Sequence, residues 1–319
     1  MPCFAALTRP IALAFAMILP AAATTTTTAA TTAAAHAVPA VPMVLADYMA
    51  LDGPVPDATL RYGQAASQYA ELFVPAGKGP FPVAVLVHGG CWTKEFGGIT
   101  QLRNMAGALA ARGIAVWNVE YRRVDEAGGG YPGTYQDMNA ALDLLARTAR
   151  DYPLDLDRLV AVGHSAGGQL VQWLAGRPRI PATSPLYHAH AVPVRRVVSL
   201  GGLADLRREA GLLKTSCGRE VVELAGTPSA ARPDVFADTN AGDLLPSGAH
   251  TILVTGELDT ISPPRVAHDF AARARAAGDA ADVVILPGAS HYDEVAATSA
   301  SWPRVLGAIE AALAAPAGR

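Results

Sequence analysis

The sequence predicts an α/β fold built on one mostly parallel sheet with helices on both faces. Short apolar runs that suit strands alternate along the chain with longer stretches of helical periodicity. The run Val-Ala-Val-Leu-Val at residues 83–87 has no polar position, as expected of a strand that helices bury on both faces. Neither an internal repeat nor a second linker divides the chain, so we expect one domain.

Local patterns place the individual elements in chain order. Short runs of β character predict strands at residues 69–74, 83–87, 114–119, 158–162, 194–200, 251–255 and 283–286. Helical periodicity predicts helices at residues 134–150, 166–175, 264–277 and 302–314. A further helix should end near Gly113, because glycine suits the position after a helix. Residues 205–245 are too long for a simple connection and poor in strand signal, so we expect a short inserted helical segment near the site.

The first 44 residues are expected to lie outside this fold. Residues 1–23 combine Arg9, an apolar run at residues 11–19 and a small-residue site ending at Ala23, which is the pattern of a secretory signal peptide. The apolar run is much shorter than the ~20 residues that span a bilayer, so we expect cleavage near Ala23 and no stable membrane anchor. Residues 24–44 form a Thr/Ala/Pro-rich linker, and the domain occupies residues 45–319. The predicted location is the periplasm or the external medium.

Composition narrows the range of partners. The 319 residues include 25 Lys+Arg and 28 Asp+Glu, a net charge of −3, and charged residues make up 17%. Without a basic excess, nucleic acid is not an expected partner. Removal of the leader with Cys3 leaves Cys91 and Cys217 as an even pair in an oxidising compartment. A disulfide and two free thiols both remain open, because sequence separation does not give the distance between the two Cα atoms.

The strongest motif is Gly-His-Ser-Ala-Gly-Gly at residues 163–168, between an expected strand and an expected helix. This is the G-x-S-x-G nucleophile elbow, in which small residues let the chain turn sharply around an exposed serine. Ser165 is therefore the candidate nucleophile. The start of the following helix offers unpaired N–H groups, so the N–H of Ala166 is a candidate donor to an oxyanion.

A second motif, His-Gly-Gly-Cys-Trp at residues 88–92, directly follows the expected strand 83–87. Loops at this position supply further oxyanion donors, and glycines let the backbone approach a substrate carbonyl. We expect the N–H groups of Gly90 and Cys91 to take this role and His88 to brace the loop. Trp92 is a candidate substrate-binding residue, with ordinary packing as the alternative.

The candidate acid and base follow later strands, in the order serine, acid, histidine. Asp259 comes after the expected strand 251–255 and His291 after 283–286, at the strand ends where open α/β sheets place their sites. His291 would accept the proton of Ser165, and Asp259 would fix its tautomer. Because His291 must be neutral for this task, activity should rise through roughly pH 6–7.

Other residues are weaker candidates for these roles. Glu257 is the runner-up acid but lies closer to the end of the expected strand, and Asp205 is a second alternative. His188 and His190 lack a third ligand at suitable spacing, so we expect no metal. No Lys-Ser/Thr pair follows the three glycines at 128–130, which therefore do not indicate a phosphate loop. No cofactor is expected.

Together these motifs resemble the α/β-hydrolase superfamily. The His-Gly-Gly-x-Trp loop is similar to that of the serine esterases that include kynurenine formamidase and the hormone-sensitive-lipase-like carboxylesterases. The resemblance covers about residues 60–315 and implies the triad Ser165, Asp259 and His291. Cys91 stands where kynurenine formamidases usually have an aromatic residue, and those enzymes are typically cytosolic. Both differences favour a general esterase over a formamidase.

The expected function is that of an exported serine esterase that cleaves short-acyl carboxylic esters through an acyl-enzyme at Ser165. Its expected partner is a small-molecule ester, and the oligomeric state is left open. An amide hydrolase, arylformamidase-like or a peptidase, could use the same residues. A non-catalytic binding protein of the same fold is the second alternative.

Overall fold

The computed structural model describes residues 41–315, and in them a single eight-stranded sheet organises the fold. The predicted signal peptide and residues 24–40 of the predicted linker lie outside the described residues. The strands are β1 (Ala58–Arg61), β2 (Tyr69–Phe73), β3 (Phe81–Val87), β4 (Ala115–Val119), β5 (Leu154–His164), β6 (Arg196–Leu200), β7 (His250–Gly256) and β8 (Ala281–Leu286).

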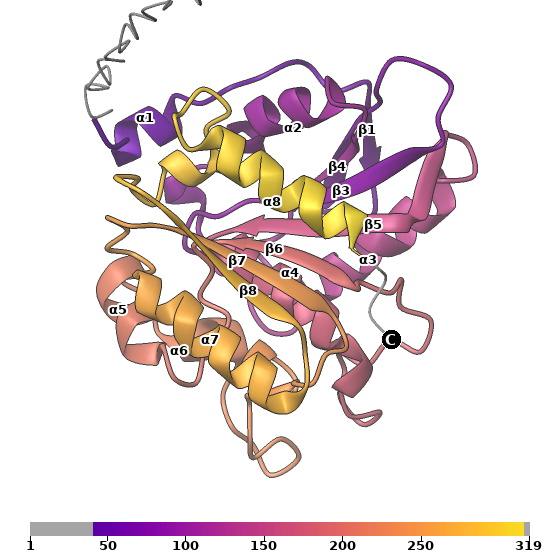
Figure 1. Cartoon of the computed structure of the whole chain (residues 1–319). Helices are drawn as coiled ribbons and strands as arrows, with labels where there is room; N and C mark the ends of the chain where they lie inside the picture. Colours follow the sequence, from indigo (N-terminus) through magenta and orange to yellow (C-terminus); the bar gives the residue numbers. More distant parts are fainter. Residues whose placement is uncertain (1–40, 316–319) are drawn as a thin grey trace, which may run out of the picture. The chain divides into compact units, whose positions relative to one another are not determined.

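The strands lie in the order β1-β2-β4-β3-β5-β6-β7-β8 (Figure 1). β2 is antiparallel to both of its neighbours, β1 and β4, whereas all other neighbouring pairs are parallel. The prediction of a mostly parallel sheet is therefore confirmed. The parallel arrangement brings the carboxyl ends of β3, β5, β6, β7 and β8 to the same edge of the sheet, where open α/β sheets bind ligands.

Helices cover both faces of the sheet. The longer helices are α2 (Arg103–Ala110), α3 (Gly133–Thr148), α4 (Ala166–Gly176), α7 (Pro264–Ala277) and α8 (Trp302–Ala314). Residues of α2 and α8 pack in one apolar cluster against one face, whereas those of α3 and α4 pack in another against the opposite face, with α7 beside them over β7 and β8 (Figure 1).

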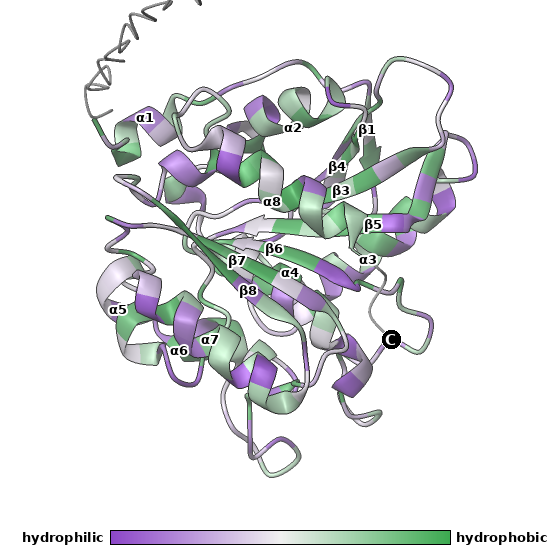
Figure 2. Cartoon of the chain, viewed as in Figure 1, coloured by the Kyte–Doolittle hydropathy of each residue, from purple (hydrophilic) through white to green (hydrophobic). Residues whose placement is uncertain are grey.

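Strand β3 shows why the central strands are apolar throughout. Val83, Val85 and Val87 belong to the cluster on the α3 and α4 side, whereas Ala84 and Leu86 belong to the cluster on the α2 and α8 side. All five side chains are fully buried. Figure 2 shows the same hydrophobic character along the central strands. Each buried Val or Leu contributes about 1.5–3 kcal/mol to folding, so the two-sided burial both holds and positions the strand ends that carry the site.

The inserted segment is helical, as predicted, and contains α5 (Ala210–Cys217), α6 (Val221–Ala225) and a short 3-10 turn at Ala241–Asp243. Among the strands and α-helices of residues 41–315, the sequence analysis did not predict β1 and the five-residue helix α1 (Leu45–Met49). Both are too short to give a clear periodic pattern. None of the helices in residues 41–315 combines the length and apolar character needed to cross a membrane.

Candidate active site

Ser165 lies at the turn between β5 and α4, at the carboxyl edge of the sheet. Its φ angle of 52° is in the left-handed region, which costs free energy for a residue with a side chain. The surrounding structure holds this conformation: the Ser165 N–H donates a hydrogen bond of 2.8 Å to the carbonyl of Leu200 at the end of β6. The motif therefore forms the sharp strand-to-helix turn that the sequence predicts.

The glycines of this motif allow close backbone packing. A Cβ atom on Gly167 would lie 2.0 Å from the carbonyl oxygen of Val87, so a larger residue would separate α4 from β3. On the neighbouring loop, a Cβ atom on Gly89 would lie 2.9 Å from Cβ of Ser165. These two glycines bring the 88–92 loop against the nucleophile.

His291 and Asp259 form a buried pair beside the same edge. His291 Nδ1 lies 2.7 Å from Asp259 Oδ2, and both side chains are buried. Asp259 Oδ1 accepts hydrogen bonds of 2.8 Å from the backbone N–H groups of Ile261 and Ser262. Because Nδ1 donates to Asp259, Nε2 of the neutral ring is the atom free to accept a proton.

Ser165 and His291 line one pocket of about 200 Å³. Among residues 41–315, the His291 side chain is hydrogen-bonded to Asp259 and makes no hydrogen bond to Ser165 Oγ. Catalytic hydrogen bonds are often long before substrate binds and tighten in the complex. The pocket thus contains a serine, a histidine and, behind the histidine, a carboxylate.

The loop after β3 also faces this pocket, which Gly90 and Cys91 line. Gly90, Cys91 and Trp92 have positive φ angles of 99°, 50° and 56°. In the described part of the chain, no backbone acceptor takes the N–H groups of Gly90, Cys91 or Ala166. The N–H groups of Gly90 and Cys91 are therefore available to an oxygen atom in the pocket, and that of Ala166 lies at the start of α4 next to Ser165. The loop keeps two non-glycine residues, Cys91 and Trp92, in a costly conformation.

His88 braces this loop from inside the protein, as predicted. Its Nδ1 lies 2.7 Å from the carbonyl oxygen of Gly89, and its Nε2 lies 2.8 Å from Glu120 Oε1. Arg123 donates to the other oxygen of Glu120 at 2.6 Å. Burial raises the pKa of the Glu120 carboxyl, but His88 and Arg123 outweigh burial and lower that pKa below its usual value. An ionised Glu120 therefore anchors the start of the loop.

A disulfide joins Cys91 to Cys217, with the two Cα atoms 5.5 Å apart. Of the two possibilities that the sequence left open, the structure contains the bridge. Cys217 is the last residue of α5, and the preceding Ser216 lines the pocket. The bridge therefore ties the 88–92 loop to the inserted helical segment, which supplies part of the pocket wall.

Trp92 lies away from the pocket wall. Its side chain is buried in the core cluster that also contains residues of α3 and α4, and Trp92 is not among the residues that line the pocket. Its carbonyl accepts a hydrogen bond from the N–H of Val124. This placement favours the packing role for Trp92 over the predicted contact with substrate.

The alternative acids point elsewhere. Glu257 is exposed, and its carboxylate accepts a hydrogen bond of 2.9 Å from the N–H of Gly288. Asp205 is paired with Arg273 and accepts a hydrogen bond from Asn240. Neither carboxylate is bonded to His291, so the structure selects Asp259 as its partner. His188 is likewise paired with a single carboxylate, that of Asp143.

Several pocket residues were not found in the sequence analysis: Leu45, Tyr48, Phe96, Ser216, Ile261 and Tyr292. Leu45 and Tyr48 lie on α1, whose Tyr48 ring packs against the rings of His164 and Tyr292. The three-residue spacing of Leu45 and Tyr48 places them on one helical face. That spacing is the signal that could have indicated a short helix next to the site.

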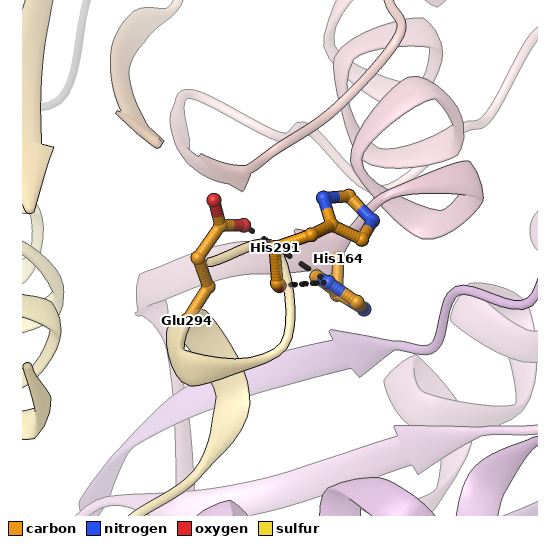
Figure 3. A group of neighbouring side chains, drawn as sticks. All are labelled: His164, His291 and Glu294. Carbon is orange, nitrogen blue, oxygen red and sulfur yellow. Dashed lines mark hydrogen bonds and ion pairs between the residues drawn. The ribbon is translucent and has the colours of Figure 1, made fainter. Parts of the chain in front are cut away.

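His164, His291 and Glu294 form a buried cluster, and the two histidines line the pocket (Figure 3). One ligand atom from each lies within 4.8 Å of the others, a spacing that a metal ion could use. However, His291 Nδ1 faces Asp259 and His164 Nε2 lies 3.0 Å from the carbonyl oxygen of His291. Both nitrogens therefore face acceptors and carry protons, so we assign the cluster to the Asp259–His291 pair rather than to a metal.

This sheet, with a serine elbow after β5 and an acid and a histidine after β7 and β8, defines the α/β-hydrolase class. A family model, BD-FAE, matches residues 71–273, which is more than half of the chain. The chain therefore belongs to the BD-FAE family. No curated protein gives a significant sequence match.

Solved structures share the fold. A truncated carbohydrate esterase from gut microbiota is 17% identical with a TM-score of 0.66, over 81% of this chain and 99% of that one. Esterase B from Lactobacillus rhamnosis, with a C4-C4 SN3 tributyrin phosphonate, is 22% identical with a TM-score of 0.66, over 82% of this chain and 85% of that one. Propionate-bound Est2 from Thermogutta terrifontis is 19% identical with a TM-score of 0.60, over 80% and 91%.

Proposed function

We propose that the protein is a carboxylic ester hydrolase with Ser165 as nucleophile. Ser165 Oγ attacks the ester carbonyl carbon while His291 Nε2 accepts the hydroxyl proton, and the N–H groups of Gly90, Cys91 and Ala166 bind the resulting oxyanion. His291 then returns the proton to the departing alcohol, which leaves an acyl group on Ser165. Water attacks this acyl-enzyme by the same sequence and releases the acid.

One observation carries the proposal. Ser165, His291, Gly90 and Cys91 line a single pocket, and His291 is bonded to Asp259. The N–H groups of Gly90, Cys91 and Ala166, the last next to Ser165 in the chain, have no backbone acceptor among the described residues. A donor of the oxyanion type contributes about 2.7–4 kcal/mol to transition-state stabilisation. The 2.7 Å bond to Asp259 holds the histidine in the tautomer that accepts a proton at Nε2.

We further propose that the acyl group is short. The pocket of about 200 Å³ is smaller than the ~300–1,000 Å³ of typical drug-sized ligand sites. Tyr48, Phe96 and Ile261 give it apolar walls. Structurally similar esterases have been solved with propionate, with butyrate and with a C4-C4 tributyrin phosphonate, all of which carry short acyl or alkyl chains.

The test is hydrolysis of p-nitrophenyl esters of increasing acyl length by the wild type and by Ser165→Ala. We expect short esters to be preferred and the variant to lose on the order of 10⁶ in turnover. Wild-type rates in the variant would exclude Ser165 as nucleophile.

Faster cleavage of N-formylkynurenine or dipeptide anilides than of esters would instead indicate an amide hydrolase. Failure of the wild type to react with a fluorophosphonate probe would indicate a binding protein.

Export is a further part of the proposal. It is supported by the leader pattern of residues 1–23 and by the Cys91–Cys217 disulfide, since disulfides persist mainly in oxidising compartments. The full chain should be expressed in a Gram-negative host and recovered from the cell fractions. We expect mature protein that starts after Ala23 in the periplasm or medium. Full-length protein retained in the cytoplasm would contradict export.

A further inference from the structure

Glu294 is a buried acid that the proposed mechanism does not use. It lies in the short turn Asp293–Val295, three residues after His291, and its side chain is fully buried. Its Oε1 accepts a hydrogen bond of 2.8 Å from the N–H of Gly256 at the end of β7, whereas Oε2 has no donor among the described residues. An ionised carboxylate in this position would lose its hydration and gain only one hydrogen bond in return, which is unfavourable in free energy.

The free oxygen of Glu294 points toward the catalytic pair. A methyl group placed on Gly201 would lie 2.6 Å from Glu294 Oε2 and 2.8 Å from His291 Nδ1. Both atoms therefore lie next to Gly201, beside the position that the methyl group would occupy. That nitrogen is the one bonded to Asp259. Asp259 Oδ2 lies 2.7 Å from the same nitrogen, and the neighbouring Asp259 carboxyl raises the pKa of Glu294 through its charge and through a side-chain hydrogen bond that the two groups can share.

The charged and titratable groups around Glu294 do not favour its ionisation. Asp259 approaches from the loop after β7, Asp293 lies on the same turn, and His164 Nε2 at the end of β5 is 4.0 Å from Oε2. Burial and the neighbouring His291 hold the pKa of His164 well below its usual value, so that ring is neutral. Burial and Asp259 in turn raise the pKa of Glu294 well above its usual value.

A hydrogen bond between two carboxyl groups requires one proton between them. Asp259 accepts bonds from two backbone N–H groups and from His291, so both of its oxygens already act as acceptors. The proton therefore belongs to Glu294, whose Oε2 becomes the missing donor. This assignment also explains why Oε2 has no other donor.

We propose that Glu294 is a positioning residue that acts in its neutral form, donating a hydrogen bond to the Asp259 carboxylate and thereby holding the Asp259–His291 pair. The inference rests on the proposed ester hydrolase function. The bond draws negative charge of Asp259 away from His291, because a carboxylate shared between two donors interacts less strongly with each. Without this donor, the Asp259 carboxylate should stabilise the protonated form of His291 more strongly.

Two variants of Glu294 distinguish a role of the neutral acid from a role of the ionised carboxylate. In Glu294→Gln, the amide oxygen can still accept from Gly256 and the amide nitrogen can still donate to Asp259, so the variant imitates the protonated acid. In Glu294→Met, a side chain of similar length removes both functions. Glu257→Gln is the matched control, because Glu257 is an exposed acid near the same loops and is bonded to Gly288 rather than to His291.

The first measurement is the pH profile of kcat/KM for p-nitrophenyl acetate. We expect Glu294→Gln and Glu257→Gln to keep the wild-type acid limb and rates within about twofold. Glu294→Met should lose about tenfold or more, with the midpoint of the acid limb moved to higher pH. An equal loss in Glu294→Gln and Glu294→Met, or a wild-type profile in Glu294→Met, would overturn the proposal.

A measurement without turnover distinguishes failure of this inference from failure of the proposed function. NMR titration of the His291 ring in the Ser165→Ala background should give one midpoint for wild-type Glu294 and Glu294→Gln, and a higher midpoint for Glu294→Met. Identical midpoints in all three would overturn the role of Glu294 whatever the reaction. If Glu294→Met does not fold, infrared spectra decide: a protonated-carboxyl band at neutral pH that Glu294→Gln lacks supports the proposal, and its absence overturns it.

Discussion

Asp259 is bonded to His291 Nδ1 across 2.7 Å, whereas Glu257, two positions earlier on the same loop, is exposed and bonded to the backbone of Gly288. The two acids follow the same strand, β7, and differ in direction rather than in chemistry. Asp259 is oriented inward by the N–H groups of Ile261 and Ser262, which bind its other oxygen. The conformation of the turn after β7 therefore determines which acid is bonded to His291.

Asp259→Asn should reduce kcat by about 10⁴-fold with little effect on folding. The amide keeps the size of the carboxylate, but its NH₂ group can face Nδ1 and leave the proton of His291 on Nε2, where it blocks acceptance of the Ser165 proton. Steady-state hydrolysis of p-nitrophenyl acetate measures the loss. Glu257→Gln on the same loop should keep wild-type activity, and the reverse ranking of the two variants would assign the catalytic acid to Glu257.

Cys217→Ser should lower both stability and activity. The bridge closes a loop of 126 residues, and cross-links of this length stabilise a protein by about 4–5 kcal/mol through the unfolded chain. The variant also frees the 88–92 loop from α5, so the N–H groups of Gly90 and Cys91 should be held less firmly. Urea unfolding and kcat measure the two effects.

Reductant provides the control for this prediction. Wild-type protein treated with dithiothreitol should approach the variant in unfolding midpoint and in kcat, whereas the reductant should leave Cys217→Ser unchanged. Full activity of the reduced wild type would show that the bridge stabilises the fold without arranging the oxyanion donors.

Strong periodicity and strand-end motifs made much of this molecule predictable. Helices Pro264–Ala277 and Trp302–Ala314 have the bounds that the sequence predicts, since each has a long apolar face. Ser165, Asp259 and His291 follow strands, and a parallel sheet brings its strand ends to one edge, so topology alone predicts that they lie near one another.

The pocket walls could not be predicted in the same way. Leu45 and Phe96 belong to a five-residue helix and a three-residue turn, which depend on tertiary packing rather than on local propensity. Ser216 reaches the pocket through a segment that the disulfide ties to the 88–92 loop. Trp92 looked like a pocket residue because of its motif, but its φ of 56° belongs to a turn that carries the side chain into the core.

Leu45→Ala should broaden the acyl preference. Leu45 is partly exposed at the pocket on α1, so its truncation enlarges the space beside Ser165 without opening the core. The ratio of kcat/KM for octanoate to that for acetate esters should rise on the order of tenfold. Met49→Ala is the matched control, since Met49 is an exposed residue of the same helix that does not line the pocket. An equal change in both variants would attribute the effect to α1 as a whole.

Glu294→Gln should stabilise the protein increasingly as pH rises. The pKa of Glu294 is raised in the folded state, chiefly by burial, so its contribution is fully present below the pKa of the unfolded chain and is lost as pH rises toward the folded pKa. Glutamine does not ionise in either state and escapes this loss. Between pH ~4.3 and the raised pKa of the folded protein, the difference in unfolding free energy between the variant and the wild type should therefore grow by about 1.4 kcal/mol per pH unit. Urea unfolding at pH 5, 6 and 7 measures this slope, with Glu257→Gln as a control that should show none. A difference that stays constant over this range would mean that Glu294 is ionised in the folded protein.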